Sequence, residues 1–167
     1  MILTTERLVL RPQEPRDSAA LLTILSDPDA MRFWSRPPIT RLAVVEEMIG
    51  EQQAAMAQGL CRYWTMMEDG EAVGSIDLSL IQDGAADLGF LVRRDRWGLG
   101  LASEAATVVV AHGLHEMQLH RIVAVSQEDN LSAKRVLEKT GFRQAECRAV
   151  LLPSGEQRPC VFYRRDA

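Results

Sequence analysis

The stretch that contains Gly98 and Gly100 constrains the fold most, because it connects a strand-like run to a helix-like run. Residues 87–92 are mostly apolar, as in a buried strand, and residues 101–114 carry apolar side chains at helical spacing. Three arginines stand just before the glycines: Arg93, Arg94 and Arg96. Glycines allow the backbone to approach an anion closely, and the first N–H groups of a helix point toward it. The stretch therefore predicts a binding site for the phosphates of a cofactor.

Apolar periodicity divides the rest of the chain into further helices and strands. Asp69-Gly70 and Asp83-Gly84 mark hairpin turns, and Gly141 is placed as the C-terminal glycine of a helix. We expect strands at residues 5–11, 62–67, 72–80, 86–92, 121–126, 142–152 and 160–164, and helices at 15–25, 40–58 (capped by Thr40), 101–114 and 131–139. The order is β-α-α-β-β-β-α-β-α-β-β. An antiparallel meander followed by alternating strands and helices predicts an α/β fold with one mixed sheet, in a single domain of residues 1–167.

The composition is that of a soluble globular protein, with 167 residues, of which 47% are apolar and 25% charged. The formal net charge of -4 gives no support for nucleic-acid binding. No apolar run approaches the roughly 18 residues that a membrane span needs. Glu6 and Arg7 interrupt the start before the apolar region of a signal peptide could form. We therefore expect a cytoplasmic protein that binds neither nucleic acid nor a membrane.

Cysteine and histidine usage argues against a metal site. The three cysteines are an odd number without CxxC spacing, which also fits a reducing compartment. His112 and His115 are three residues apart, with His120 nearby, but no carboxylate at ligand spacing completes a site. We expect no bound metal, and histidines that belong to the surface or the core.

Three segments of the chain carry recognisable patterns. Residues 5–12 read TERLVLRP, residues 97–105 read WGLGLASEA, and residues 130–142 read NLSAKRVLEKTGF. In this order and at these separations they resemble the GNAT superfamily of acyl-CoA-dependent N-acetyltransferases, in particular its RimJ/RimL-type branch. The element order fits that family over nearly the whole chain. The resemblance implies a GNAT-like mixed, mostly antiparallel central sheet with helices on both faces.

The resemblance also implies acetyl-CoA as co-substrate. In the family, the loop equivalent to residues 95–100 holds the pyrophosphate through backbone N–H groups, and the strand equivalent to residues 91–93 pairs with the pantetheine arm, whose two amides need partners. The asparagine that matches Asn130 contacts the arm near its reactive end, which makes Asn130 a catalytic candidate as well. The candidate cofactor-binding residues are Leu91, Val92, Arg93, Arg94, Arg96, Trp97, Gly98, Leu99, Gly100, Leu101, Ala102, Asn130 and Lys134.

Two positions depart from the family pattern. Asp95 stands where the superfamily has Gln or Arg, and an acidic side chain beside a pyrophosphate is unfavourable unless it points away. The frequent tyrosine general acid is Leu137 here, which leaves the proton donor to the departing thiolate unassigned. Ser132 is the next candidate, although the family's serine position is occupied by Ala133.

Acetyl transfer requires a neutral amine, because an ammonium has no lone pair. Lysine-type amines titrate near ~10.4 and α-amino groups near ~8, so a carboxylate base favours the reaction. Asp87 occupies the strand position where superfamily members often carry a catalytic Glu; the alternative is an acid on an exposed strand face. Glu104 is more simply a partner of the helix dipole. Phe33 and Trp34 are candidate substrate residues, because family members shape the acceptor pocket with this loop.

The main hypothesis is an acetyl-CoA-dependent N-acetyltransferase that acts on a primary amine, either a protein or peptide N-terminus or a small molecule. No Ser-His-Asp order or nucleophile elbow favours an acyl-enzyme, so direct transfer in a ternary complex is expected. One alternative is a non-catalytic acyl-CoA-binding or regulatory module of the same fold. Another is an NAD-type oxidoreductase, because residues 98–103 half-match G-x-G-x-x-G, although that fingerprint belongs to a first βα unit. Acceptor identity, and the choice between monomer and homodimer, stay open.

Overall fold

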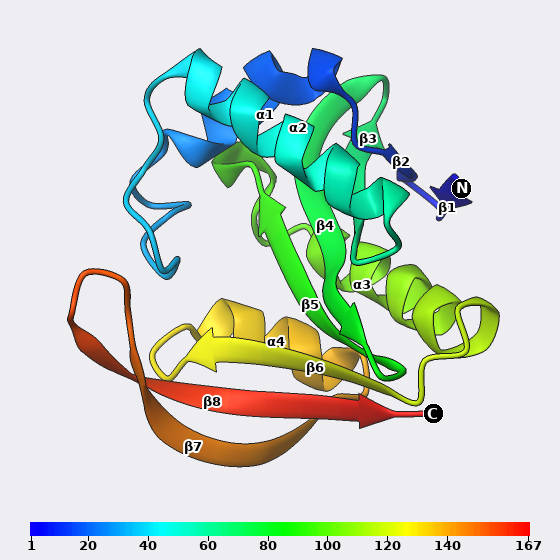
Figure 1. Cartoon of the computed structure of the whole chain (residues 1–167), viewed down its shortest axis with the longest axis vertical. Coiled ribbons are helices and arrows are strands. Elements are labelled where there is room, and N and C mark those ends of the chain that lie inside the picture. Colours follow the sequence, from blue (N-terminus) through cyan, green and yellow to red (C-terminus); the bar gives the residue numbers. More distant parts are fainter.

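The computed structural model describes residues 1–167 and contains one eight-stranded sheet in the order β1-β2-β3-β4-β5-β6-β8-β7 (Figure 1). Every neighbouring pair of strands is antiparallel except β5 and β6, which are parallel. The strands are β1 (Leu3–Thr4), β2 (Val9–Pro12), β3 (Arg62–Glu68), β4 (Glu71–Gln82), β5 (Ala85–Val92), β6 (Arg121–Gln127), β7 (Arg143–Leu151) and β8 (Gln157–Asp166). The expected mixed, mostly antiparallel sheet is confirmed.

The meander β3-β4-β5 is closed by the two Asp-Gly turns that the sequence marks. Asp69 and Gly70 have φ values of 49° and 84°, and Asp83 and Gly84 have 49° and 71°. Positive φ at both central residues defines the turn that matches the right-handed twist of paired strands, and aspartate followed by glycine tolerates it best. The first turn joins β3 to β4, and the second joins β4 to β5, which pair from Ser79 with Asp87 to Gly74 with Val92.

Helices cover both faces of the sheet (Figure 1). The helices α1 (Ser18–Leu25) and α2 (Leu42–Ala57) lie on one face, and α3 (Leu101–Ala111) and α4 (Leu131–Lys139) lie on the other. No helix combines the length and the hydrophobicity that a crossing of the bilayer needs. Gly141 follows α4 with φ 83°, so it ends that helix as expected.

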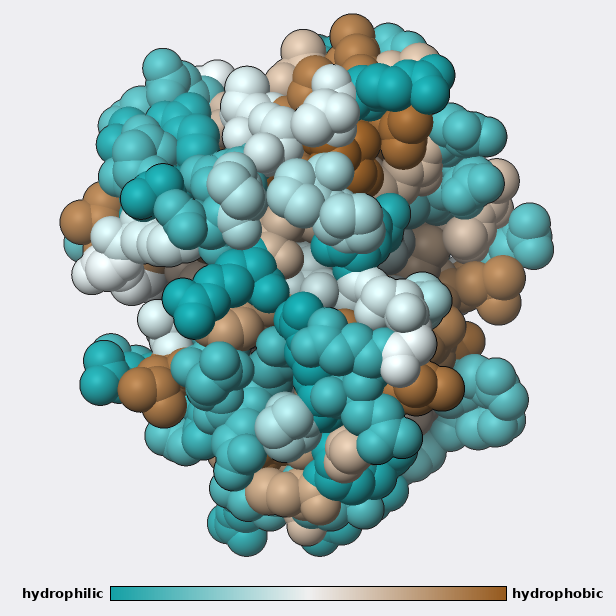
Figure 2. Space-filling view, turned by 90° about the vertical axis from the view of Figure 1, so that its left-hand side faces the viewer, coloured by the Kyte–Doolittle hydropathy of each residue, from teal (hydrophilic) through white to brown (hydrophobic).

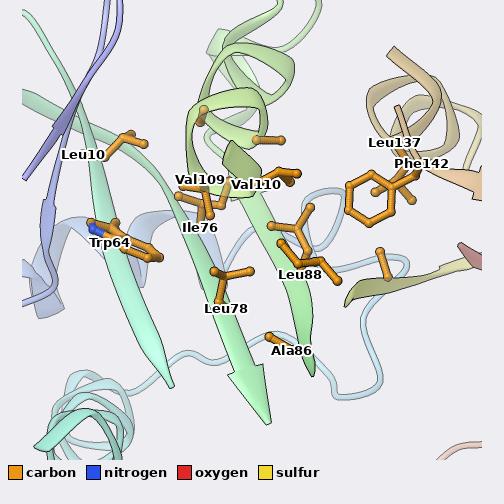
Figure 3. Packing of buried hydrophobic residues seen from close by; sticks show 14 of the residues in the cluster. Leu10, Trp64, Ile76, Leu78, Ala86, Leu88, Val109, Val110, Leu137 and Phe142 are labelled. Carbon is orange, nitrogen blue, oxygen red and sulfur yellow. The ribbon is translucent and has the colours of Figure 1, made fainter. Parts of the chain in front are cut away.

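The larger core lies between the sheet and the helices α3 and α4, and contains 23 buried residues. Figure 3 shows Ile76 and Leu78 of β4 and Leu88 of β5 beside Val109 and Val110 of α3. A smaller cluster of 9 residues joins α1, α2 and the loop between them to Leu91 of β5. Successive side chains of β5 thus alternate between the two faces, with Leu88 on the side of α3 and Leu91 on the side of α1.

The expected first strand, residues 5–11, is wrong in extent. The chain instead forms two short strands, β1 and β2, which pair with each other around a turn in which the Thr5 N–H donates to the Leu8 carbonyl at 2.9 Å. The turn is held from outside. Glu104 of α3 accepts hydrogen bonds from the Arg7 backbone N–H at 2.9 Å, from the Arg7 guanidinium and from the Thr5 hydroxyl. Alternating hydrophobicity alone does not reveal a partner 97 residues away.

Two helix ends also differ from expectation. The second helix begins at Leu42, with Arg41 at its N-cap and no side-chain cap, so Thr40 does not cap it. The helix expected at 101–114 is α-helical only to Ala111 and continues as a π-turn from His112 to Glu116. The apolar spacing persists through the π-turn, because Gly113 and Leu114 are still buried.

The parallel pair β5–β6 is short. It contains three residue pairs, from Ala85 with Arg121 to Asp87 with Val123, and beyond Asp87 the two strands diverge (Figure 1). From Leu88 onward β5 pairs only with β4, and from Ala124 onward β6 pairs only with β8. The backbone edges that face each other across the gap are therefore left without a strand partner.

We predict that Glu104→Ala lowers the free energy of unfolding by about 1–3 kcal/mol, because it leaves the Arg7 and Thr5 donors without their acceptor. Urea denaturation measures the change. The matched control is Glu51→Ala at an exposed position of α2, which we expect to alter stability by less than about 0.5 kcal/mol. Equal effects of the two substitutions would contradict the structural role assigned to Glu104.

Candidate functional site

A groove of about 930 Å³ opens where β5 and β6 diverge. Its walls come from residues 88–92 of β5, residues 124–127 of β6, the start of α3 and one side of α4. The α1–α2 loop and the end of β7 close its other side, through residues that include Phe33, Trp34, Val150 and Leu152. More than half of its lining residues are hydrophobic, as is usual for a groove that takes an organic ligand.

The loop between β5 and α3 forms an anion-binding end of this groove. Gly98 and Gly100 have φ values of 76° and 82°, which a residue with a Cβ adopts only at a cost. Six consecutive backbone N–H groups, from Gly98 to Ser103, donate to no acceptor within the protein. They lie at the N-terminus of α3, where the helix dipole also favours negative charge. The donor set fits the two charged groups of a pyrophosphate.

The three arginines before the glycines are engaged with carboxylates. Arg93 binds Asp95 and Glu71, Arg96 binds Glu68, and Arg94 binds Asp29. The side chains of Arg94 and Arg96 line the groove, whereas that of Arg93 does not. The positive charge of Arg94 and Arg96 at the groove is therefore shared with Asp29 of the α1–α2 loop and Glu68 of β3.

Asp95 points away from the groove, and Trp97 lines it with its indole N–H already bonded. The Asp95 carboxylate accepts from the Arg93 guanidinium at 2.7 Å and does not line the groove; that hydrogen bond lowers the pKa of Asp95. The Trp97 indole N–H donates to the Val92 carbonyl at 2.7 Å, which fixes the loop to the end of β5. An acid at position 95 therefore does not put negative charge among the free N–H groups.

Asn130 combines both of the roles that its position suggests. Its side-chain oxygen accepts from the Ala133 N–H at 3.2 Å as the N-cap of α4, and the residue also lines the groove. Ser132 lines the groove, and Leu137 is buried in the larger core. Lys134 points elsewhere, with its ammonium 3.4 Å from the Glu128 carbonyl, so the basic side chains that α4 presents to the groove are Arg135 and Lys139.

The α1–α2 loop, which carries Phe33 and Trp34, is tied to the far end of β6. The Gln127 side-chain amide donates to the Phe33 carbonyl at 2.9 Å, and the Arg158 guanidinium donates to Gln127 Oε1 at 3.2 Å and to the Arg32 carbonyl at 3.4 Å. Figure 2 faces this side of the molecule and shows mostly hydrophilic residues with smaller hydrophobic patches. The sequence gives no signal for Gln127 or Arg158, because their partners lie more than 90 residues away or on another strand.

Two aspartates lie on the sheet face that α1 and α2 cover. Asp87 is on the same side of β5 as Leu91 and is half-buried, and this burial raises its pKa. Asp77 of β4 lies opposite Gly89, is only 8% exposed and forms no ion pair. Burial, and then the charge of Asp87, raise the pKa of Asp77 to about 7, against a hydrogen bond with Ser79 that lowers it. Sequence analysis missed Asp77, although an acid inside a run of alternating strand residues marks it.

The remaining sequence candidates lie outside the groove. His112 is half-buried and packs edge-on against Trp64, with ring centroids 6.0 Å apart, while His115 and His120 are exposed. No group of three or more His, Cys, Asp and Glu side chains has the arrangement of a metal site. Glu104 is occupied by Thr5 and Arg7, which gives it a structural role.

A family model described as an acetyltransferase (GNAT) domain matches residues 7–143. The chain belongs to the GNAT acetyltransferase family. An uncharacterized N-acetyltransferase p20 of Bacillus licheniformis is 28% identical over 146 residues, which cover 85% of this chain and 82% of that protein. The spermidine N(1)-acetyltransferase of Escherichia coli is 22% identical over 135 residues, 80% of this chain and 71% of that enzyme.

Solved structures agree with this family at the level of the fold. RimL, a ribosomal L7/L12 α-N-protein acetyltransferase in complex with coenzyme A, superposes with a TM-score of 0.89 at 19% identity and covers 99% of this chain and 98% of that one. The family model shows an acyltransferase, and the superposition shows that its fold is RimL-like. Its mostly antiparallel sheet, with the glycine loop after β5, is not the Rossmann arrangement that the oxidoreductase alternative requires.

We predict that Asp77→Asn makes this GNAT protein more stable relative to wild type as the pH rises. Native Asp77 keeps its proton up to about pH 7, whereas the unfolded chain releases it near the ordinary pKa of aspartate. The stability of the wild type therefore falls as the pH rises between these two pKa values, and stays constant above the higher one. The difference in unfolding free energy between variant and wild type should grow by about 2–3 kcal/mol from pH 5 to pH 8. Urea titrations at both pH values measure it. Asp83→Asn, in an exposed turn, should leave the difference unchanged.

Proposed function

We propose that this protein is an acetyl-CoA-dependent N-acetyltransferase that moves an acetyl group to a primary amine by direct transfer in a ternary complex. The observation that carries the proposal is the row of six free N–H groups at one end of an apolar groove between diverging strands. This arrangement matches a ligand with a pyrophosphate at one end and an amide-containing arm beyond it. Bound acetyl-CoA supplies an acetyl group activated as a thioester.

The residues present fit acetyl-CoA along the whole groove. The N–H groups of residues 98–103 hold the pyrophosphate, and Arg94 and Arg96 add positive charge beside it. The free edge of β5 at Leu91 and Val92, continued by Arg93, would pair with the pantetheine amides. Asn130 lies on the opposite wall, on α4, within reach of the same arm.

Asp87 is the proposed general base for the amine. It lies in the last residue pair before β5 and β6 diverge, directly before Leu88, the first β5 residue that lines the groove. Its partial burial raises its pKa, which makes the carboxylate a better proton acceptor than an exposed aspartate. Asp87 would take one proton from the acceptor ammonium, which frees the nitrogen lone pair to bond to the acetyl carbon as the C–S bond breaks. The second N–H proton of the amine would then leave as the amide forms, and the departing thiolate would gain a proton to become the free thiol.

The acceptor enters from the side of the α1–α2 loop. Phe33 and Trp34 of that loop line the groove, and Gln127 and Arg158 hold the loop in place. The related proteins act on chemically different amines, spermidine in one case and a ribosomal protein N-terminus in the other. We propose a peptide N-terminus as the first acceptor to test, with small amines as the second class.

The proposed function is tested by following thiol release from acetyl-CoA with a panel of peptide N-termini, polyamines, amino acids and aminoglycosides. Turnover on one class would identify the acceptor. Binding of acetyl-CoA without turnover on any amine would favour a non-catalytic acyl-CoA-binding module. A chain that is stabilised by NAD and not by acetyl-CoA would overturn the proposal.

We expect Gly98→Ala to raise the dissociation constant of acetyl-CoA at least about tenfold, because a Cβ there separates the phosphates from the free N–H groups. Isothermal titration calorimetry measures the constant. Gly155→Ala is the matched control: Gly155 also has positive φ (85°) and open space around its Cβ position, but lies in the β7–β8 hairpin. Both variants carry the same strain of roughly 1–2 kcal/mol, so only the first should bind weakly.

Asp87→Asn should reduce kcat/KM by about 10²–10³-fold near pH 7 and by less at higher pH, where the amine loses its proton without help. Initial rates from pH 6 to pH 10 give the profile, and acetyl-CoA affinity should stay close to that of wild type. The exposed Asp83→Asn serves as the isosteric control. A constant ratio of wild-type to variant rate at every pH would remove Asp87 from the mechanism.

A further inference from the structure

Asp77 is a buried carboxyl that the proposed mechanism does not use. Its Cα faces Gly89 on β5 and Tyr63 on β3 across the sheet. A Cβ placed on Gly89 would lie 2.7 Å from Asp77 Oδ1, so the carboxyl occupies the space that a side chain at position 89 would otherwise fill. No arginine, lysine or histidine forms an ion pair with it. A buried acid without a cation is costly, so its retention calls for an explanation.

The strand register places Asp77 beside the proposed base. Ser79, the next residue of β4 on the same face, is hydrogen-bonded to Asp77 and is also the Cα partner of Asp87. Asp77, Ser79 and Asp87 therefore form one polar row that runs from β4 to β5 beneath α1 and α2. After the larger effect of burial, a negative charge on Asp87 also raises the pKa of Asp77.

We infer that Asp77 is a positioning residue for deprotonation of the acceptor amine. When Asp77 ionises, its negative charge lies close to Asp87 and strengthens Asp87 as a base. The inference rests on the proposed function, because Asp87 is the base only if an amine is acetylated. Asp77 itself touches neither the amine nor the thioester; it works through the neighbouring carboxylate.

The mechanism is repulsion between like charges. Two carboxylates on one partly buried surface do not both ionise at low pH, and Asp87, the more exposed, ionises first. Asp77 stays neutral until about pH 7, and its later ionisation adds a second negative charge that makes Asp87 hold a proton more tightly. Above neutral pH the pair is therefore a stronger base than Asp87 alone.

The groups around Asp77 do not mask this effect. Tyr63 of β3 and Cys61, just before that strand, have pKa values that are raised by burial and by the charge of Asp77, so both stay neutral near pH 7. Helix α1 contributes apolar side chains, and α2 contributes Gln52, which is hydrogen-bonded to Tyr63 and Gln13. Asp87 on β5 is the charged group that remains.

The first test compares the pH dependence of kcat/KM for wild type and Asp77→Asn, with the amine found in the acceptor panel. Asparagine mimics neutral Asp77 at every pH. We expect the two proteins to be equally fast at pH 6 and wild type to be about three- to tenfold faster at pH 8.5. Asp83→Asn, in an exposed turn outside this row, removes one carboxylate elsewhere and should retain the wild-type pH dependence. A ratio that does not change with pH would overturn the inference.

The second test needs neither activity nor the Asp77→Asn variant. The ¹³Cγ resonances of aspartate report each titration in wild type and in Asp87→Asn. We expect the midpoint of Asp77 to fall by at least half a pH unit when the charge of Asp87 is removed, and an unmoved midpoint would overturn the inference. If no amine is acetylated, the proposed function fails while this titration still decides whether the two carboxyls are coupled.

Discussion

The site depends on a short parallel contact in an otherwise antiparallel sheet. β5 and β6 share three residue pairs and then diverge, because each has a different partner on its outer side: β4 for β5, and β8 for β6. Both partners come from tight antiparallel hairpins that fix the twist of the strands. The divergence leaves two backbone edges without hydrogen bonds inside the protein. A ligand with amide groups can satisfy them without distortion of the fold.

The two faces of the sheet are built for different purposes. The face against α3 and α4 is apolar and holds the larger core. The face against α1 and α2 carries polar groups as well, and two of its buried acids differ in whether a cation is bound to them. Burial alone would raise the pKa of Asp17, but hydrogen bonds from Arg11, Thr65 and the Glu14 N–H lower it below its ordinary value. Asp77 has no such cation, so burial keeps it neutral up to near-neutral pH. One acid stabilises the fold, and the other is free to change charge.

Local signals in the sequence predict the fold well where neighbours along the chain decide the geometry. The Asp-Gly turns, Gly141 after α4 and Asn130 as an N-cap all follow from residues within a few positions. The misses share another cause, namely partners far away in sequence. Glu104 bends residues 5–8 into a turn, and Gln127 and Arg158 hold the α1–α2 loop. Asp77 belongs to the same class, because only strand register shows that it meets Gly89 and Ser79, rather than solvent.

Arg7 links the N-terminal hairpin to the glycine loop and to α3, more than 90 residues later in the chain. Its guanidinium binds Glu104 of α3 and also the Leu99 carbonyl, at 2.9 Å, within the glycine loop. The N-terminal hairpin and the anion-binding loop therefore share one set of contacts. By thermodynamic linkage, a ligand that orders the loop also stabilises the hairpin. Fraying of the first strands weakens ligand binding by the same coupling free energy. The N-terminal hairpin thus supports the anion-binding loop through the Arg7 side chain.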